Sequence, residues 1–146
     1  MPAKPWPSAV LPHDLAGVFT DIDDTLTKHG AIEPAALDAL HALHAARVPV
    51  IAITGRPVGW SEPFARAWQL AAIVPENGAV ALIRDGDNVR TEYAQDAATR
   101  ERNAKRLAEV AARVLAEVPG ATLAQDSAGR VTDIAIDHSE FAHLDD

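Results

Sequence analysis

Short aliphatic runs alternate with amphipathic segments through the first half of the chain. The runs at 15–20, 48–53 and 71–74 predict buried strands, because they are short, apolar and bounded by acidic or turn residues. Between them, 34–47 has leucines at helical spacing behind a first-turn proline, and 61–70 has a proline early enough for a helix to tolerate. The order strand, helix, strand, helix, strand with short connections predicts a parallel sheet with right-handed crossovers.

The pattern changes in the second half, where two predicted hairpins flank one long helix. Strands at 79–83 and 89–93 enclose a turn-forming stretch, and a second pair is predicted at 121–125 and 131–136. The helix at 97–118 has alanine, leucine and valine along one stripe and most of its arginines off that stripe. The first half is therefore predicted to be α/β and the second half α+β, with the change between residues 78 and 83.

The bulk composition fits one ordinary soluble domain. The 146 residues include 13 basic and 21 acidic side chains, and the net charge of −8 argues against nucleic acid or an anionic membrane as a partner. The chain has no cysteine, which excludes disulfides, thiolate catalysis and cysteine-based zinc sites. Neither a signal peptide nor a membrane-spanning run is recognisable, so a cytoplasmic location is the default expectation.

The strongest chemical signal is the cluster Asp21-Ile22-Asp23-Asp24-Thr25, directly after the first predicted strand. Buried charges are costly, so these carboxylates are expected to face solvent, a metal or a ligand at the carboxyl end of the sheet. If the chain stays extended, Asp21 and Asp23 point to the same side, where a cation would relieve their repulsion. Mg²⁺ suits such a pair, since it binds one or two carboxylates together with phosphate oxygens and water.

The Asp cluster has two alternative interpretations besides a magnesium site. The general one is an acidic, solvated turn. A calcium loop beginning at Asp21 would need Gly and Glu at its sixth and twelfth positions, which hold Leu26 and Ile32. The Gly-rich dinucleotide fingerprint and the phosphate-binding P-loop are both absent from the sequence.

A second signal, Thr54-Gly55-Arg56, follows the second predicted strand. A hydroxyl group and free backbone N–H groups between a strand and a helix can bind a phosphate. Alone this signal is weak, because many strand-to-helix turns contain Thr-Gly. One crossover after the Asp cluster, however, it predicts a phosphate site beside a pair of carboxylates at the same edge of the sheet.

Together these motifs resemble the haloacid dehalogenase (HAD) superfamily. Residues 19–26, Phe-Thr-Asp-Ile-Asp-Asp-Thr-Leu, match its first motif, an apolar strand that ends in DxDxT. Residues 53–56 are similar to the second motif of the branch that contains Cof-type, sucrose-phosphate and mannosyl-phosphoglycerate phosphatases. Residues 75–79 resemble the ENGA segment of that branch, where the chain leaves the core for a cap domain.

The resemblance implies a role for each matching residue. Asp21 would be the nucleophile and a Mg²⁺ ligand, and Asp23 would be the general acid/base and a Mg²⁺ ligand through its backbone carbonyl. Thr54 and the Gly55 backbone would bind the transferring phosphoryl group. Arg56 would orient the phosphate or the rest of the substrate.

The sequence departs from the family pattern after these motifs. The family has a third motif with a lysine after the cap, whereas the lysines here are Lys4, Lys28 and Lys105, none at the required place. It also has a fourth, acidic motif, to which Asp145 and Asp146 at the chain end do not correspond. We therefore expect the sequence to be truncated inside the cap, and the 146 residues to be weakly active or inactive as a phosphatase.

The predicted organisation is a disordered tail at 1–14, the N-terminal part of a Rossmann-like α/β core with its first three strands at 15–80, and a partial α+β cap at 81–146. The resemblance implies a hydrolase of small phosphorylated metabolites, with a sugar phosphate as the expected substrate and an aspartyl-phosphate intermediate. An inactive binding or regulatory module with the same fold stays open, as does a phosphotransferase or mutase. A homo-oligomer is also expected, because so few parallel strands leave apolar surface exposed.

Overall fold

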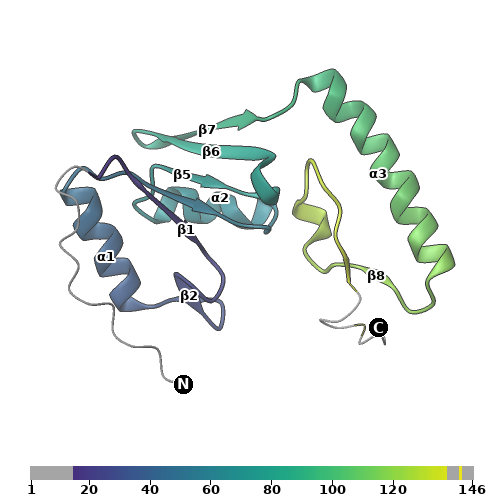
Figure 1. Ribbon diagram of the computed structural model, residues 1–146, viewed down its shortest axis with the longest axis horizontal. Coiled ribbons are helices and arrows are strands. Elements are labelled where there is room, and N and C mark those ends of the chain that lie inside the picture. The colour runs from purple at the N-terminus through teal and green to yellow at the C-terminus, as the bar shows by residue number, and fades with distance from the viewer. Residues whose placement is uncertain (1–14, 138–141, 143–146) are drawn as a thin grey trace.

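The computed structural model describes residues 15–137 and residue 142, so the tail expected at 1–14 lies outside the described residues. Its main sheet has five strands in the order β1-β4-β5-β6-β7 (Figure 1). The bounds of these strands are β1 (Val18–Asp21), β4 (Val50–Ile53), β5 (Ala72–Val74), β6 (Val80–Asp85) and β7 (Asn88–Tyr93). The described residues also form two small antiparallel sheets, one of β2 (Thr27–Lys28) with β3 (Ala31–Ile32) and one of β8 (Thr122–Leu123) with β9 (Ile136–Asp137).

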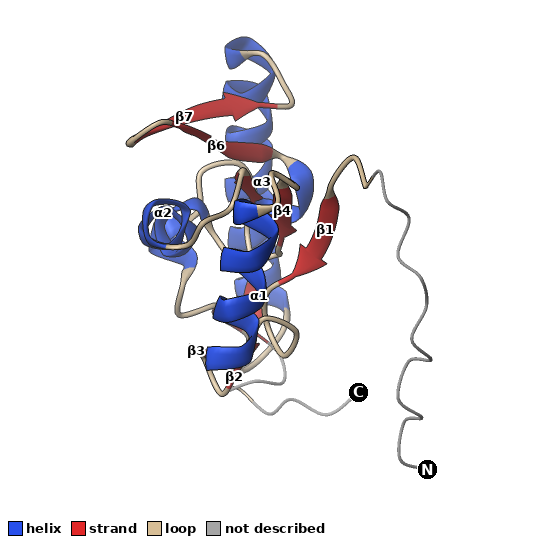
Figure 2. Cartoon of the chain, turned by 90° about the vertical axis from the view of Figure 1, so that its left-hand side faces the viewer, coloured by secondary structure: helices blue, strands red, loops and turns tan. Residues whose placement is uncertain are grey.

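The predicted parallel unit is confirmed. β1 pairs with β4 and β4 pairs with β5, both in parallel, and the connections contain helix α1 (Pro34–Ala45) and helix α2 (Val58–Ala67). Because the strands are added in one direction by crossovers of one hand, both helices lie on the same face of the sheet (Figure 2). The chain therefore has the parallel α/β sheet that its hydrophobic pattern predicts and the Rossmann-like core that the family resemblance implies.

Helix α2 begins and ends about three residues before the predicted range of 61–70. It begins at Val58, whose backbone N–H donates to the carboxylate of Glu76, so a distant side chain satisfies one of the free N–H groups of the first turn. It ends at Ala67, because Trp68 has an extended backbone with ψ of 147°. Neither feature is visible in the local spacing of apolar residues.

The first predicted hairpin belongs to the main sheet. β6 runs antiparallel to β5, with Ala72 opposite Ile83 and Ile73 opposite Leu82, and β7 continues the sheet beyond β6. The predicted boundary between core and cap, at residues 80/81, therefore falls at the start of a strand inside one hydrogen-bonded sheet. The buried side chain of Leu82 explains this position, because it joins the core beneath α2. The assignment of the rest of 81–146 to a partial cap stays a prediction.

Helix α3 (Ala97–Glu117) matches the long helix predicted at 97–118. Asp96 caps its start, since its carboxylate accepts a hydrogen bond from the backbone N–H of Thr99 at 2.9 Å. The helix lies beyond the end of β7, and the segment that follows it turns back toward the sheet (Figure 1).

The second predicted hairpin is only partly correct. β8 and β9 are antiparallel, as expected, but β9 begins at Ile136 and not at Val131. The N–H groups of Val131 and Thr132 donate to the carboxylate of Glu76 and are not available to a neighbouring strand. Residues 127–129 between the two strands form a 3₁₀ turn, η2 (Ser127–Gly129).

The hydrophobic core lies between the sheet and the face of α1 and α2. It contains nine buried side chains: Ile22, Leu40, Val50, Ala52, Ala65, Trp68, Leu70, Ile73 and Leu82. The other face of β1 and β4 is open, since Phe19 is 69% and Ile53 41% exposed. No helix among the described residues is long and apolar enough to cross a membrane.

Candidate active site

The carboxyl ends of β1 and β4 bring the two sequence motifs together. Asp21 is the last residue of β1 and pairs in register with Ile53, the residue before Thr54. The first motif and the predicted phosphate-binding motif therefore lie side by side at one edge of the sheet. This is the edge at which parallel α/β sheets bind their ligands.

The Asp cluster is a tight turn and not an extended strand. The carbonyl oxygen of Ile22 accepts hydrogen bonds from the backbone N–H groups of Thr25, Leu26 and Thr27 at 2.9–3.3 Å, and Asp24 has a positive φ of 56°. Asp21 and Asp23 were expected to point to one side if the chain stayed extended. The chain turns directly after β1, so this condition is not met. Asp21 is exposed, and within the described residues its carboxylate accepts one long hydrogen bond, of 3.5 Å, from the hydroxyl of Thr25.

Thr54, Gly55 and Arg56 form a compact loop between β4 and α2. The hydroxyl oxygen of Thr54, which is 4% exposed, accepts a hydrogen bond from the backbone N–H of Arg56 at 3.1 Å. Its hydroxyl hydrogen is left to donate, as a phosphate-binding group must. A Cβ atom at Gly55 would lie 3.2 Å from the side-chain oxygen of Asn77, so a larger residue would crowd this loop.

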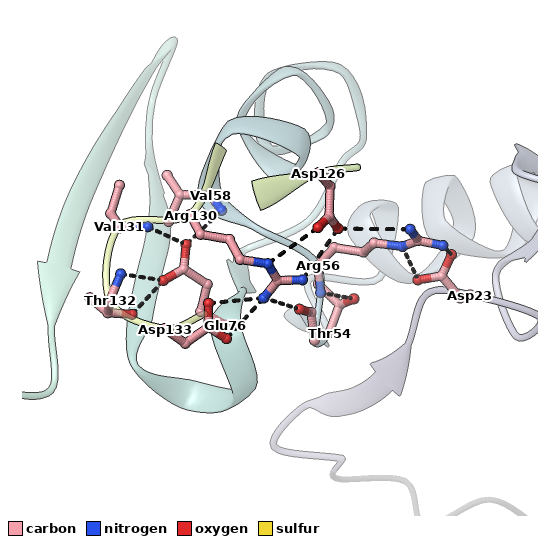
Figure 3. Close-up of polar contacts among 11 residues, drawn as sticks. Asp23, Thr54, Arg56, Val58, Glu76, Asp126, Arg130, Val131, Thr132 and Asp133 are labelled. Atoms are coloured by element: carbon pink, nitrogen blue, oxygen red, sulfur yellow. Dashed lines mark hydrogen bonds and ion pairs between the residues drawn. The ribbon is translucent and has the colours of Figure 1, made fainter. Parts of the chain in front are cut away.

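Arg56 links the two motifs through its side chain. Its Nε and Nη2 atoms donate to the two carboxylate oxygens of Asp23, each at 3.1 Å, in a bidentate ion pair (Figure 3). Its Nη1 atom lies 3.9 Å from the carboxylate of Asp126, and its guanidinium lies 5.6 Å from the ring centre of Trp60. The proposed general acid/base and the proposed phosphate-orienting residue are therefore in direct contact.

A segment that the sequence pattern predicted to be a hairpin turn also reaches this edge of the sheet. Arg130 donates to both carboxylate oxygens of Asp126 at 3.2 Å, to Asp133 at 2.9 Å and to the carbonyl oxygen of Gly55 at 3.2 Å. Burial alone would lower the pKa of Arg130, but the carboxylates of Asp133 and Asp126 outweigh it and raise the pKa above its ordinary value. We call residues 126–133 the return segment.

Glu76 fastens the return segment to the core. Its side chain is 2% exposed, and its carboxylate accepts hydrogen bonds from the backbone N–H groups of Val58, Val131 and Thr132 and from the Thr132 hydroxyl. Burial raises the pKa of Glu76, but the hydrogen bond from the Thr132 side chain and those from the three backbone groups together lower it below its ordinary value. Figure 3 shows this cluster beside the Arg130 network.

Sequence reasoning missed four of these polar residues, namely Glu76, Asp126, Arg130 and Asp133. The three residues of the return segment stand at spacings of four and three, which place side chains together in a turn or a helical bend, and this spacing was a usable signal. Glu76 lies in the ENGA-like segment, but the sequence did not indicate its partners Val131 and Thr132, which are 55 and 56 residues away.

The fit of a metal ion to this site depends on a small number of oxygen donors. Within them, no group of three or more His, Cys, Asp or Glu side chains could together hold a metal ion. The exposed carboxylate of Asp21 and the backbone carbonyl of Asp23 are oxygen donors of the kind that Mg²⁺ prefers. Mg²⁺ needs no more than one or two protein carboxylates when substrate and water complete its coordination, so these residues fit such an ion.

Residues 18–117 match the family model of the haloacid dehalogenase-like hydrolases. The match covers more than half of the chain and includes both motifs, so the chain belongs to this family. No curated protein sequence matches the chain significantly.

Solved structures support the same fold. The chain is similar to Thermoplasma acidophilum 0175, with a TM-score of 0.64 and 14% identity over 86% of this chain and 52% of that one. It is also similar to a hypothetical protein from Geobacillus kaustophilus HTA426, with a TM-score of 0.51 and 27% identity over 68% of this chain and 37% of that one. A third similar structure, from a phosphoryl-transfer superfamily, has a TM-score of 0.52 and 21% identity over 91% and 51% of the two chains. The chain thus spans about half or less of the length of these structures.

Proposed function

We propose that this chain carries the nucleophile motif of a Mg²⁺-dependent phosphomonoester hydrolase. Its substrate would be a small phosphorylated metabolite such as a sugar phosphate, and the reaction would pass through an aspartyl-phosphate on Asp21. The observation that carries the proposal is the register of β1 with β4, which sets the exposed Asp21 carboxylate beside the Thr54 loop. Family membership supports a hydrolase, and the described geometry supports these particular residues.

In the proposed reaction, Asp21 attacks phosphorus and Asp23 protonates the leaving alcohol oxygen. The O–P bond to the alcohol breaks as the bond to Asp21 forms. Asp23 then takes a proton from water, whose oxygen attacks the phosphorus of the aspartyl-phosphate and regenerates Asp21. The hydroxyl of Thr54 and the backbone of Gly55 would hold the phosphoryl oxygens during both steps.

Mg²⁺, bound by the Asp21 carboxylate and the Asp23 carbonyl, would supply the positive charge that lets a carboxylate approach a phosphate dianion. Arg56 has a related task. Its guanidinium pairs with Asp23, and a phosphate dianion would compete for the same guanidinium. Substrate binding would in this way release Asp23 for proton transfer.

The test is hydrolysis of p-nitrophenyl phosphate with and without MgCl₂. Asp21→Asn should lower kcat about 10³-fold or more, because an amide cannot form the phospho-intermediate. Asp24→Asn is the matched control and should stay near wild type, since Asp24 belongs to the same turn but has no proposed role. Equal activity of wild type and Asp21→Asn would refute the assignment.

A second measurement keeps this test decisive if the 146 residues turn over more slowly than about 1 s⁻¹, as their sequence predicts. Beryllium fluoride binds carboxylates as a phosphoryl mimic, and ¹⁹F NMR should detect it on wild type with Mg²⁺ but not on Asp21→Asn. Absence of a beryllium fluoride signal on the wild type would favour the non-catalytic module. Transfer of phosphate to an added alcohol would favour a phosphotransferase.

A further inference from the structure

A separate cavity lies where α3 meets the core, beside the turn η1 (Glu76–Gly78). Its volume is about 410 Å³, within the range of small-molecule pockets. α3 forms one wall, the turn and the two residues after β7 form another, and Thr132 of the return segment closes a third side. Figure 1 shows the return segment between α3 and the sheet, which is why the cavity has walls from three parts of the chain.

The charge of this cavity is opposite to that of the chain as a whole. The net charge of the chain is −8, yet the described residues that line the cavity include Arg100 and Arg106 and no Asp or Glu. Residues whose side chains can donate hydrogen bonds also line it, namely Asn77, Gln95 and Asn103. Such a set of positively charged and hydrogen-bond-donating groups, with no carboxylate among them, favours an anion.

The two arginines differ from Lys105 and Arg113 of the same helix. Lys105 pairs with Glu101 and Arg113 pairs with Glu117, each at i and i+4 on the helix surface. Among the described residues, the Arg106 guanidinium has no ion pair or hydrogen bond. The Arg106 guanidinium is therefore available to a ligand, whereas the side chains of Lys105 and Arg113 on the same helix are already paired.

Arg100 is instead held in place. Its guanidinium lies 3.7 Å from the ring centre of Tyr93, and one of its nitrogens donates to the carbonyl oxygen of Gln95 at 2.9 Å. A guanidinium fixed by stacking loses less entropy when it binds a ligand. The side chains of Leu107 and Val110, from the next turns of α3, add an apolar surface to the same cavity.

We propose that this cavity binds a small organic anion. Its phosphate or carboxylate group would lie between Arg100 and Arg106, and its apolar part against Leu107 and Val110. The anion could be the second acidic group of the phosphatase substrate or a separate metabolite, because Asn77 touches both sites. The backbone N–H of Asn77 donates to the Thr54 carbonyl oxygen at 3.2 Å, and the same residue lines the cavity.

The test is isothermal titration of the chain with phenylphosphonate, an aromatic anion whose C–P bond is not hydrolysed. Arg106→Gln and Arg100→Gln should each weaken binding about tenfold, the effect of losing one charged hydrogen bond. Arg113→Gln is the matched control, since it removes an arginine from the same helix but not from the cavity, and its Kd should be unchanged. Far-UV circular dichroism checks that α3 is intact in each variant.

A bis-anionic probe, 3-phosphonopropionate, separates the two sources of the anion. If Thr54→Val and Arg106→Gln both weaken its binding, one ligand spans both sites; if only Arg106→Gln does, the cavity takes a separate metabolite. Either result supports the cavity as an anion site. The proposal is overturned if phenylphosphonate does not bind, if benzyl alcohol binds equally well, or if neither arginine substitution changes the Kd. None of these readouts depends on phosphatase activity.

Discussion

The residues of this site are positioned in two ways, either by the neighbouring strand or by contacts with residues far away in the sequence. Asp21 is the last residue of β1 and Thr54 directly follows β4, so their positions follow from the local pattern. Glu76 is placed by contacts across the molecule, and its backbone has a positive φ of 50°, which non-glycine residues rarely adopt. Four hydrogen bonds to its carboxylate compensate for the burial of its charge.

Glu76→Gln should therefore destabilise the chain by about 1–3 kcal/mol at neutral pH, because an amide cannot accept all four hydrogen bonds and leaves donors unsatisfied. Urea denaturation at about pH 7 measures the loss. Glu62→Gln is the control, since Glu62 forms only an exposed pair with Arg66 and should matter little. An equal loss in both variants would contradict this role for Glu76.

The same carboxylate predicts a pH dependence. Its folded-state pKa lies below the ordinary value of 4.5, so its contribution to stability is complete above about pH 4.5. That contribution is lost as the pH falls through the folded-state pKa. The difference in unfolding free energy between wild type and Glu76→Gln should consequently shrink between pH 7 and about pH 3.

Among the elements, α2 has the most connections to the site. Its first N–H group donates to Glu76, its N-terminus follows the Thr54 loop, and η2 packs against it. That last contact is very close, since a Cβ atom at Gly59 would lie 3.0 Å from the Cα of Gly129. Only a glycine at position 59 lets the return segment approach the helix this closely.

Gly59→Ala tests this contact. The substitution has two opposing effects on stability. Alanine favours a helix over glycine by about 1 kcal/mol, whereas a forced shift of the return segment costs about 1–3 kcal/mol. We expect net destabilisation in urea denaturation, together with faster proteolysis within 126–133. Gly129→Ala is the control, since its Cβ would have only ordinary contacts at 3.4–3.5 Å. A more stable Gly59→Ala variant would show that the return segment is loosely held.

At the scale of the whole molecule, the sheet has one covered face and one open face. Parallel sheets are usually buried on both faces, yet Phe19 on β1 and Ile53 on β4 are exposed. β1 is also the edge of the main sheet among the described residues, with β4 as its one neighbour. An apolar face beside an open edge favours association with further protein surface.

We expect the 146-residue chain to self-associate through this face, and Phe19→Ser to reduce the average mass measured by multi-angle light scattering. Substitution of an exposed side chain should change the stability of the monomer by less than about 0.5 kcal/mol. Val118→Ser is the control, because Val118 is 42% exposed at the end of α3, away from the sheet. A monomeric wild type, or an equal effect of both substitutions, would count against the prediction.

The sequence by itself determined the parallel core, helix α3 and the meeting of the Asp cluster with the Thr54 loop. These features follow from the periodicity of neighbouring residues and from the rule that parallel strands end at one edge of a sheet. Tertiary structure alone decided that β6 and β7 join the main sheet, that residues 131–135 are not a strand, and that Arg56 pairs with Asp23. The physical reason is that these contacts join residues far apart in the sequence. The pattern of a strand does not specify which strand it pairs with, and a carboxylate in the sequence does not specify which groups will donate to it. Glu76 takes three of its four hydrogen bonds from residues 55 or 56 positions away, which no local pattern can encode.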